Sequence, residues 1–108
     1  MAEPVYRVSI RIAGNTEIPS LLALQTKGYA LKLWRCKSHD DEYLQNFDAE
    51  KDGCIFSATT AEELLGLVAM WEVRGDDWQK QRSESNVYQI LDDCSVTYDS
   101  EGNVIEDD

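Results

Sequence analysis

The first residues that could do chemistry form an acidic stretch with the spacing of a calcium-binding loop. Asp48, Glu50 and Asp52 alternate and Gly53 follows, as in the first half of a helix–loop–helix calcium site. Such a loop closes with a bidentate carboxylate at its twelfth position, which is Thr59 here. A hairpin turn also needs glycine and tolerates carboxylates. The missing closing ligand therefore favours a six-residue hairpin loop over a calcium site.

The side chains that could hold a soft metal or act as nucleophiles are few. Cys36 and His39 are two residues apart, whereas Cys54 and Cys94 stand alone, and zinc sites usually combine two close pairs. Cys36, His39 and Asp40 could form a catalytic triad only if the fold made them converge, and triads are normally built from distant segments. The sequence has no phosphate-binding loop, dinucleotide motif or serine elbow. We expect no metal, no cofactor and no enzymatic activity.

A tryptophan beside carboxylates is the more informative combination. Trp78 lies in a polar stretch where it has no periodic role, and it follows Asp76 and Asp77 directly. An exposed tryptophan flanked by acids is typical of a protein-binding anchor, because the indole fills a pocket while the acids meet basic side chains. The alternative is that Trp78 folds back over the preceding helix as a lid on the core. The predicted partner-binding residues are Trp78, Asp76, Asp77, Glu72, Asp40 and Asp41.

The charge of the chain limits the class of partner. Its 21 acidic and 10 basic residues give a net charge of −11. Nucleic-acid binding relies on cationic side chains that release counterions, so we expect no nucleic-acid partner. Anionic membranes are disfavoured for the same reason. A basic protein partner is compatible with this charge, and so is a surface that serves solubility alone.

Length and composition indicate one domain. The 108 residues, 43% of them hydrophobic, can form one packed core, and we expect a single α+β domain over 1–108. There is no apolar run long enough for a transmembrane helix, and the first residues lack the pattern of a signal peptide. Three widely spaced cysteines do not suggest a disulfide framework. These features predict a cytoplasmic protein.

The elements that must position these residues follow from hydrophobic periodicity and turn signals. Residues 4–12 alternate between apolar and polar side chains and predict a half-buried strand. Thr60 and Glu63 form a capping box ahead of an apolar stripe, and Gly66 within that helix suggests a close approach of its backbone to a sheet. Residues 87–91 are compatible with strand or helix, and we favour strand. The predicted elements are strands at 4–12, 29–37, 43–47, 53–58 and 87–91, a helix between Thr16 and Gly28, a helix between Thr60 and Gly75, and a hairpin of 95–98 with 104–105.

These elements, taken as the order β-α-β-β-α-β with one further strand between the helices and an extra terminal hairpin, predict one antiparallel sheet with two helices on one face. The nearest named topology is the ferredoxin-like arrangement. It would let each helix bury its apolar stripe against the sheet.

In size, acidity and lack of catalytic motifs the chain resembles small single-domain bacterial proteins that neutralise a basic toxin, often a nuclease. The resemblance implies an immunity-type inhibitor whose carboxylates and aromatic anchor occupy the toxin's cationic cleft, with electrostatically steered association. The alternative is a structural or regulatory domain that dimerises, with Arg7, Arg11 and Lys32 lining a surface. A small enzyme that uses Cys36 or paired carboxylates is the third hypothesis.

Overall fold

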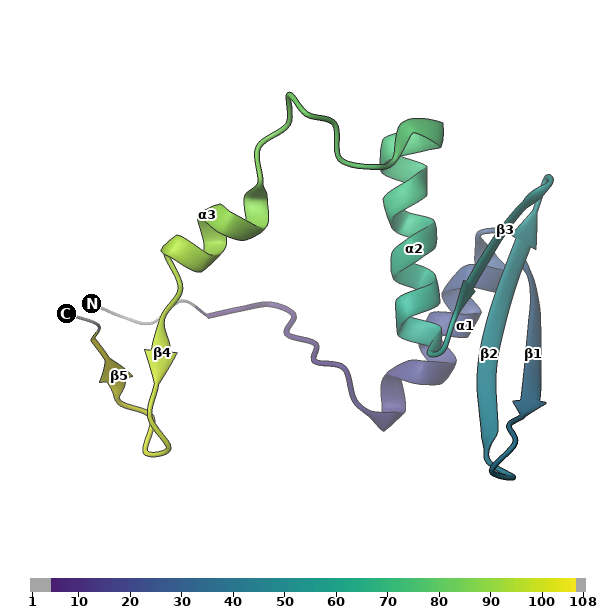
Figure 1. Cartoon of the computed structure of the whole chain (residues 1–108), viewed down its shortest axis with the longest axis horizontal. Coiled ribbons are helices and arrows are strands. Elements are labelled where there is room, and N and C mark those ends of the chain that lie inside the picture. Colours follow the sequence, from purple (N-terminus) through teal and green to yellow (C-terminus); the bar gives the residue numbers. More distant parts are fainter. Residues whose placement is uncertain (1–4, 107–108) are drawn as a thin grey trace. The chain divides into compact units, whose positions relative to one another are not determined.

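The structure is a computed structural model and describes residues 5–106 (Figure 1). It is an α+β protein that divides into two compact units, Met1–Trp78 and Gln79–Asp108. The elements are η1 (Gly14–Thr16), α1 (Glu17–Thr26), β1 (Ala30–Lys37), β2 (Tyr43–Lys51), β3 (Cys54–Ala58), α2 (Ala61–Arg74), η2 (Gly75–Asp77), α3 (Val87–Asp93), β4 (Thr97–Tyr98) and β5 (Val104–Ile105). That one domain spans 1–108 stays a prediction.

The first unit is built on a three-stranded antiparallel sheet of order β1-β2-β3. Lys51 pairs with Cys54, so β2 and β3 are joined by the two-residue turn Asp52-Gly53. Both turn residues have positive φ, 51° and 79°, which is the backbone of the tight hairpin turn that suits strand twist. The predicted hairpin is confirmed. Its predicted six-residue loop is wrong in length, because Asp48 and the residues up to Lys51 continue β2 as a strand.

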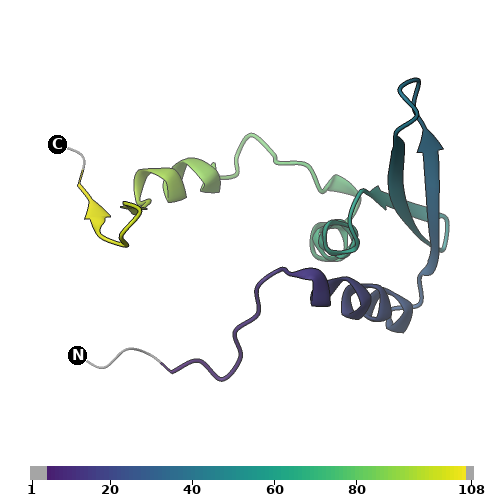
Figure 2. The same ribbon diagram turned by 90° about the horizontal axis from the view of Figure 1, so that it is seen from below.

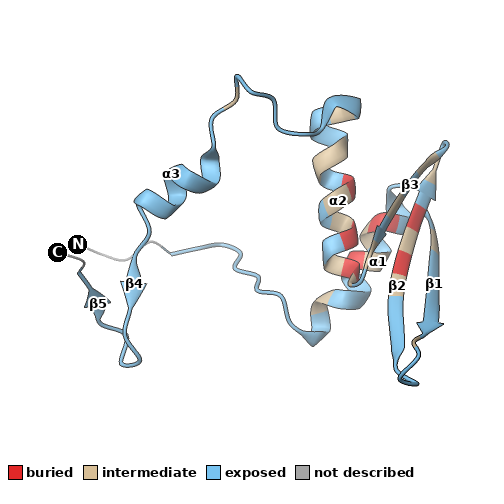
Figure 3. Cartoon of the chain, in the orientation of Figure 1, coloured by how far each residue is buried: buried red, intermediate tan, exposed pale blue. Residues whose placement is uncertain are grey.

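Both helices of this unit cover one face of the sheet (Figure 2). Buried residues lie at alternate positions of β2 and along one stripe of each helix (Figure 3), as expected where apolar side chains exclude water between a sheet and its helices. The buried core consists of Leu24, Tyr29, Phe47, Ala49, Leu64 and Val68. The opposite face of the sheet carries no helix of this unit, so the sheet has one covered and one open face.

Helix α2 begins and ends where the sequence predicts. The Thr60 side chain accepts a hydrogen bond from the backbone N–H of Glu63 at 3.1 Å, and Gly75 follows the last turn with φ 77°. The expected close backbone approach at Gly66 is wrong. A Cβ built on Gly66 meets nothing within 4 Å, because this residue faces outward.

Helix α1 also forms as predicted, but Thr16 does not cap it with its side chain. The Thr16 hydroxyl instead donates to the carbonyl oxygen of Ala13 at 2.7 Å and lies 3.3 Å from Oε1 of Glu62. These contacts anchor the start of α1 to the first turn of α2.

The strand predicted over residues 4–12 is wrong. Residues 5–12 are exposed and have no regular secondary structure, and Pro4 lies outside the described residues. An alternating pattern specifies a strand only where a sheet edge is available to pair with it. Although β1 and β3 are both unpaired edges of the three-stranded sheet, residues 5–12 pair with neither, so the pattern has no partner strand among the described residues.

The second unit holds α3 and the β4–β5 hairpin. The strand predicted over 87–91 is wrong, because Asn86 caps a helix there by accepting a hydrogen bond from the backbone N–H of Gln89 at 3.1 Å. The terminal hairpin is confirmed, and its turn is organised by the Asp99 carboxylate, which accepts from the backbone of Glu101 and Asn103. With neither 5–12 nor 87–91 in a strand, the ferredoxin-like order is not confirmed.

Candidate functional site

An apolar groove lies between the edge strand β3 and helix α2. It encloses about 260 Å³. Its lining residues are Ile55, Phe56, Ser57, Leu67, Met70, Trp71 and Trp78. They come from three places in the chain, the strand, the helix and the segment that follows η2, so the groove exists only because α2 packs beside β3.

The strand that forms one wall is an unusual sheet edge. Both β1 and β3 are edge strands, because the sheet order is β1-β2-β3. Edge strands are commonly protected by charged side chains, and β1 carries Lys32, Arg35 and Lys37. The sequence of β3, CIFSA, has no charge, and Ile55 on its open face is 61% exposed. Backbone groups at alternate positions of an edge strand point away from its neighbour. β3 can therefore accept a further strand.

Trp78 borders this groove and is 43% exposed. It is held by its backbone, since its carbonyl oxygen accepts a hydrogen bond from Nε of Arg74 at 2.7 Å. Trp71 packs on Phe56 with ring centroids 5.6 Å apart, and its indole N–H lies 3.4 Å from Oδ1 of Asp76. Trp78 is neither fully exposed nor sealed in: it lies beside Leu67, Met70 and Trp71 with 43% of its surface accessible, so the anchor and the lid both stay predictions.

The predicted acidic residues do not all come together. Asp76 and Asp77 are exposed in η2, next to Trp78. Glu72 instead forms an ion pair with Lys27 after α1, at 2.6 Å between Nζ and Oε1. That pair lies on the α1 side of α2, away from the groove, and it neutralises the Glu72 charge.

The other two predicted acids are remote. Asp40 and Asp41 lie in the β1–β2 turn, at the opposite end of the sheet from η2 (Figure 1). Asp41 has a positive φ of 62° and forms an ion pair with Lys37 at 3.3 Å. The cluster that the structure assembles is Asp76, Asp77 and Trp78.

Sequence reasoning missed the apolar half of the site. Leu67 and Met70 fall within the apolar stripe that follows the Thr60 capping box, and Ile55 falls within the strand predicted at 53–58, but neither pattern predicts a groove between them. The signal that could have found them is the absence of charge from β3, since an uncharged edge strand next to an apolar helix flank is an unprotected surface.

One hydrogen-bonded carboxylate lies next to this strand on the open face of the sheet. The Ser57 hydroxyl donates to Oδ1 of Asp48 at 2.6 Å. This bond, followed by one from Trp34, lowers the pKa of the Asp48 carboxyl from its ordinary value of 3.8, because both favour the charged form. Asp48 is half-buried and Ser57 is exposed, and the bond keeps the two side chains aligned across the β2–β3 pair.

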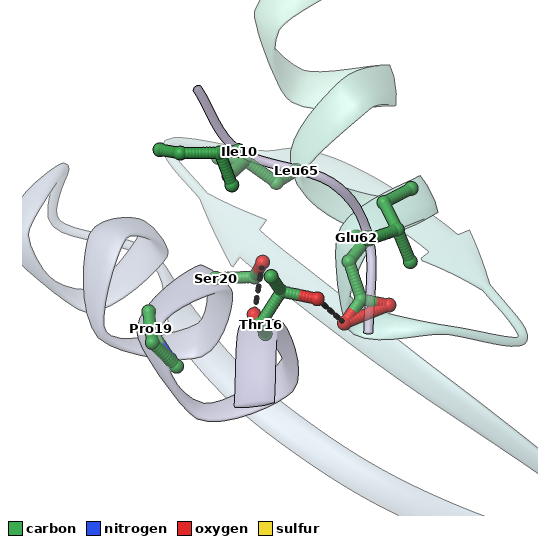
Figure 4. Close-up of a pocket in the computed structure, with 7 residues that line it drawn as sticks. Ile10, Thr16, Pro19, Ser20, Glu62 and Leu65 are labelled. Carbon is green, nitrogen blue, oxygen red and sulfur yellow. Dashed lines mark hydrogen bonds between the residues drawn. The ribbon is translucent and has the colours of Figure 1, made fainter. Parts of the chain in front are cut away.

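A second hollow lies between the first turns of α1 and α2 (Figure 4). Its walls are mainly apolar, and its polar groups already bond one another, with the Ser20 hydroxyl donating to the carbonyl oxygen of Thr16 at 2.7 Å. Of the described residues in its lining, Glu62 alone carries a titratable side chain. The lining residues are Ile10, Ile12, Thr16, Pro19, Ser20, Glu62 and Leu65. The Thr16 hydroxyl beside Glu62 donates to the carbonyl oxygen of Ala13 at 2.7 Å, so the pair is not arranged as a nucleophile and its base.

The four candidate soft-metal ligands lie in separate parts of the chain. Cys36 is the next-to-last residue of β1 and is exposed, His39 lies in the following turn, Cys54 begins β3, and Cys94 follows α3. Within residues 5–106 no three His, Cys, Asp or Glu side chains are grouped closely enough to hold a metal ion.

No protein-family model, curated protein or solved structure matches the chain. Among the helices in residues 5–106, none combines the length and apolar character needed to cross a membrane.

Proposed function

We propose that this chain is a protein-binding module that takes a basic, partly apolar segment of another protein along the β3 edge. The observation that carries the proposal is the half-exposed Trp78 in an apolar groove, beside two exposed carboxylates and an uncharged sheet edge. Each of these features recognises a different part of the same extended ligand. The proposed role is not catalytic.

The mode of recognition is strand addition. An extended segment of the partner would form main-chain hydrogen bonds with β3, which give affinity without dependence on sequence. Its alternate apolar side chains would enter the groove against Leu67, Met70 and Trp71. A lysine or arginine at one end would then approach Asp76 and Asp77. This combination selects a strand that alternates apolar and basic residues.

The net charge of −11 supports the proposal kinetically. An acidic protein attracts a cationic partner over several ångströms and speeds its association, while the groove determines how long the complex lasts. A basic toxin neutralised by an immunity-type inhibitor is one partner of this chemistry, and a cytoplasmic location is the compartment we propose.

The proposal can be tested with a defined probe. A labelled eight-residue peptide that alternates valine with lysine is titrated with the protein and followed by fluorescence anisotropy, beside a peptide that alternates valine with glutamate. We expect the lysine peptide to bind and the glutamate peptide not to bind. Raising the salt from about 0.1 M to about 1 M shortens the screening length from about 10 Å to about 3 Å and should slow association.

Matched charge variants locate the site. Neutralising Asp76 and Asp77 together to asparagine should slow association of the lysine peptide about threefold or more. Neutralising Asp40 and Asp41 together changes the net charge equally but at the far end of the sheet, so it should have a smaller effect. Equal effects from the two double variants, or equal binding of the two peptides, would refute a site at the β3 edge.

A further inference from the structure

One segment of the chain has the pattern of a strand but no strand to pair with. In residues 5–12 the apolar side chains of Tyr6, Val8, Ile10 and Ile12 alternate with Arg7, Ser9 and Arg11. The four apolar side chains are between 57% and 78% exposed. Such alternation is typical of a strand with one covered face, and here neither face is covered.

The same unit contains an edge that lacks a strand. β3 is uncharged, and the groove beside it is lined mainly by apolar side chains. β1, the other edge, carries three basic residues, which would repel a segment that itself contains two arginines and no acid. The chain therefore contains a strand-like segment, residues 5–12, that pairs with no sheet edge, and a sheet edge, β3, that pairs with no further strand.

Within one chain, residues 5–12 and the β3 edge lie on different sides of α2, so the segment does not reach its own β3. Ile10 and Ile12 lie with Leu65 in the hollow on the α1 side of the helix (Figure 4). Leu67 and Met70, which line the groove, point to the other side of α2, because they are two and five positions from Leu65 and so lie about 200° and about 140° around the helix from it. Figure 2 shows α2 end-on, with the segment before α1 and the strand β3 on different sides of it.

We infer that residues 5–12 of a second copy of this chain add as a fourth strand to the β3 edge, and that two copies exchange these strands reciprocally. Val8 and Ile10 would lie over the groove. Arg7 and Arg11 would then lie on the open face of the sheet, where β2 presents carboxylates, among them Asp48. The exchange closes a two-fold dimer and leaves no edge of β3 exposed.

The inference rests on the groove of the proposed function, but it does not need an outside partner. The dimer would fill the groove in the absence of a partner, so that a basic segment from another protein must displace residues 5–12. Self-association would thus regulate the site.

The test is the mass of the full chain in solution, measured by sedimentation velocity across a range of concentrations. We expect a dimer of twice the 12.3 kDa chain mass. Ile10→Asp should raise the dimer Kd about a hundredfold or more, because it places an unpaired carboxylate in an apolar groove. Ile18→Asp is the matched control, since Ile18 is also exposed, at 59%, but lies in α1 outside the segment. It should leave the dimer intact.

Ile55→Lys tests the other half of the contact by adding a charge to the β3 edge, and it should also give a monomer. Circular dichroism of each variant shows whether the fold is kept, and hydrogen exchange of the wild-type chain should show concentration-dependent protection in both 5–12 and 54–58. A monomeric wild-type chain, or a dimer unaffected by Ile10→Asp, would overturn the inference.

The failure of this inference can be distinguished from failure of the proposed function. A wild-type monomer that binds the lysine peptide, with binding lost in Ile55→Lys, would remove the dimer and keep the function. A dimer that the peptide does not dissociate, together with an Ile10→Asp monomer that does not bind the peptide, would keep the dimer and remove the function.

Discussion

The packing of α2 on the sheet creates the groove, so the orientation of this helix is the first feature to test. Val68 and Val73 lie on the same helix, but Val68 is 0% exposed and Val73 is 85% exposed. Replacing each by alanine removes the same atoms and gives the same small gain in helix propensity, of roughly 0.5 kcal/mol. The difference between the two variants therefore measures burial alone.

The expected magnitudes follow from that burial. Val68→Ala removes two buried carbon groups at about 0.8 kcal/mol each, and the cavity that remains brings the loss to about 2–3 kcal/mol. After the propensity gain, unfolding free energy should fall by about 2 kcal/mol. Val73→Ala loses almost no buried area, so it should be neutral or stabilising by up to about 0.5 kcal/mol.

Urea denaturation followed by tryptophan fluorescence is a suitable assay, because all three tryptophans, Trp34, Trp71 and Trp78, belong to the first unit. For a small domain, a loss of about 2 kcal/mol lowers the urea midpoint by about 1–2 M. Equal midpoints for the two variants would mean that α2 does not present Val68 to the sheet. The groove as described would then not exist.

Three further predictions concern local structure. Gly66→Ala should stabilise the protein by about 0.5–1 kcal/mol, because Gly66 is an outward-facing helix position with room for a Cβ. Gly53→Ala should destabilise the protein by about 1–2 kcal/mol, because φ is 79° at Gly53. Denaturation midpoints that move in the same direction for the two variants would contradict this pair of predictions. Ser57→Ala should raise the pKa of the Asp48 carboxyl toward 3.8 in an NMR titration, since it removes the bond that most favours the charged form, and an unchanged titration would show that the bond does not form in solution. Thr60→Ala should cost about 1 kcal/mol through loss of the helix cap, as judged by thermal unfolding.

Local signals in the sequence were sufficient for much of the fold. The limits of α2 follow from Thr60 and Gly75 with an apolar stripe between them, and the β2–β3 hairpin follows from Asp52-Gly53 between two strand patterns. In these cases the residues that determine the structure are neighbours in sequence. The strand predicted over 87–91 was wrong because a short apolar run fits either a strand or a helix, and the cap at Asn86 decides between them.

The strand predicted near the N-terminus failed for a different reason. Its alternation is clear, but whether a strand forms depends on an edge that the sequence of the segment does not contain. Non-local contacts also explain the mixed result at the site. Trp78 and Asp76 are adjacent to the helix end and could be found by inspection, whereas Glu72 is neutralised by Lys27, which lies 45 residues away. Ion pairs across such distances cannot be read from spacing.

If two ligands compete for the groove, the affinity measured for one of them depends on the total protein concentration. If residues 5–12 of a second copy and a basic partner both bind the β3 edge, the partner meets a free groove only in the monomer. Its apparent affinity should then decrease as the total protein concentration rises through the dimer Kd, by the fraction of chains that remain monomeric.

The monomeric variant Ile10→Asp should abolish this dependence and bind the lysine peptide at least as tightly as the wild-type chain, because its groove is always free. Ile18→Asp should keep the dependence. Peptide affinity that is independent of protein concentration in a wild-type chain that dimerises would show that the two ligands use different surfaces. In that case the exposed Trp78 and the unpaired edge of β3, although adjacent, would belong to separate interactions.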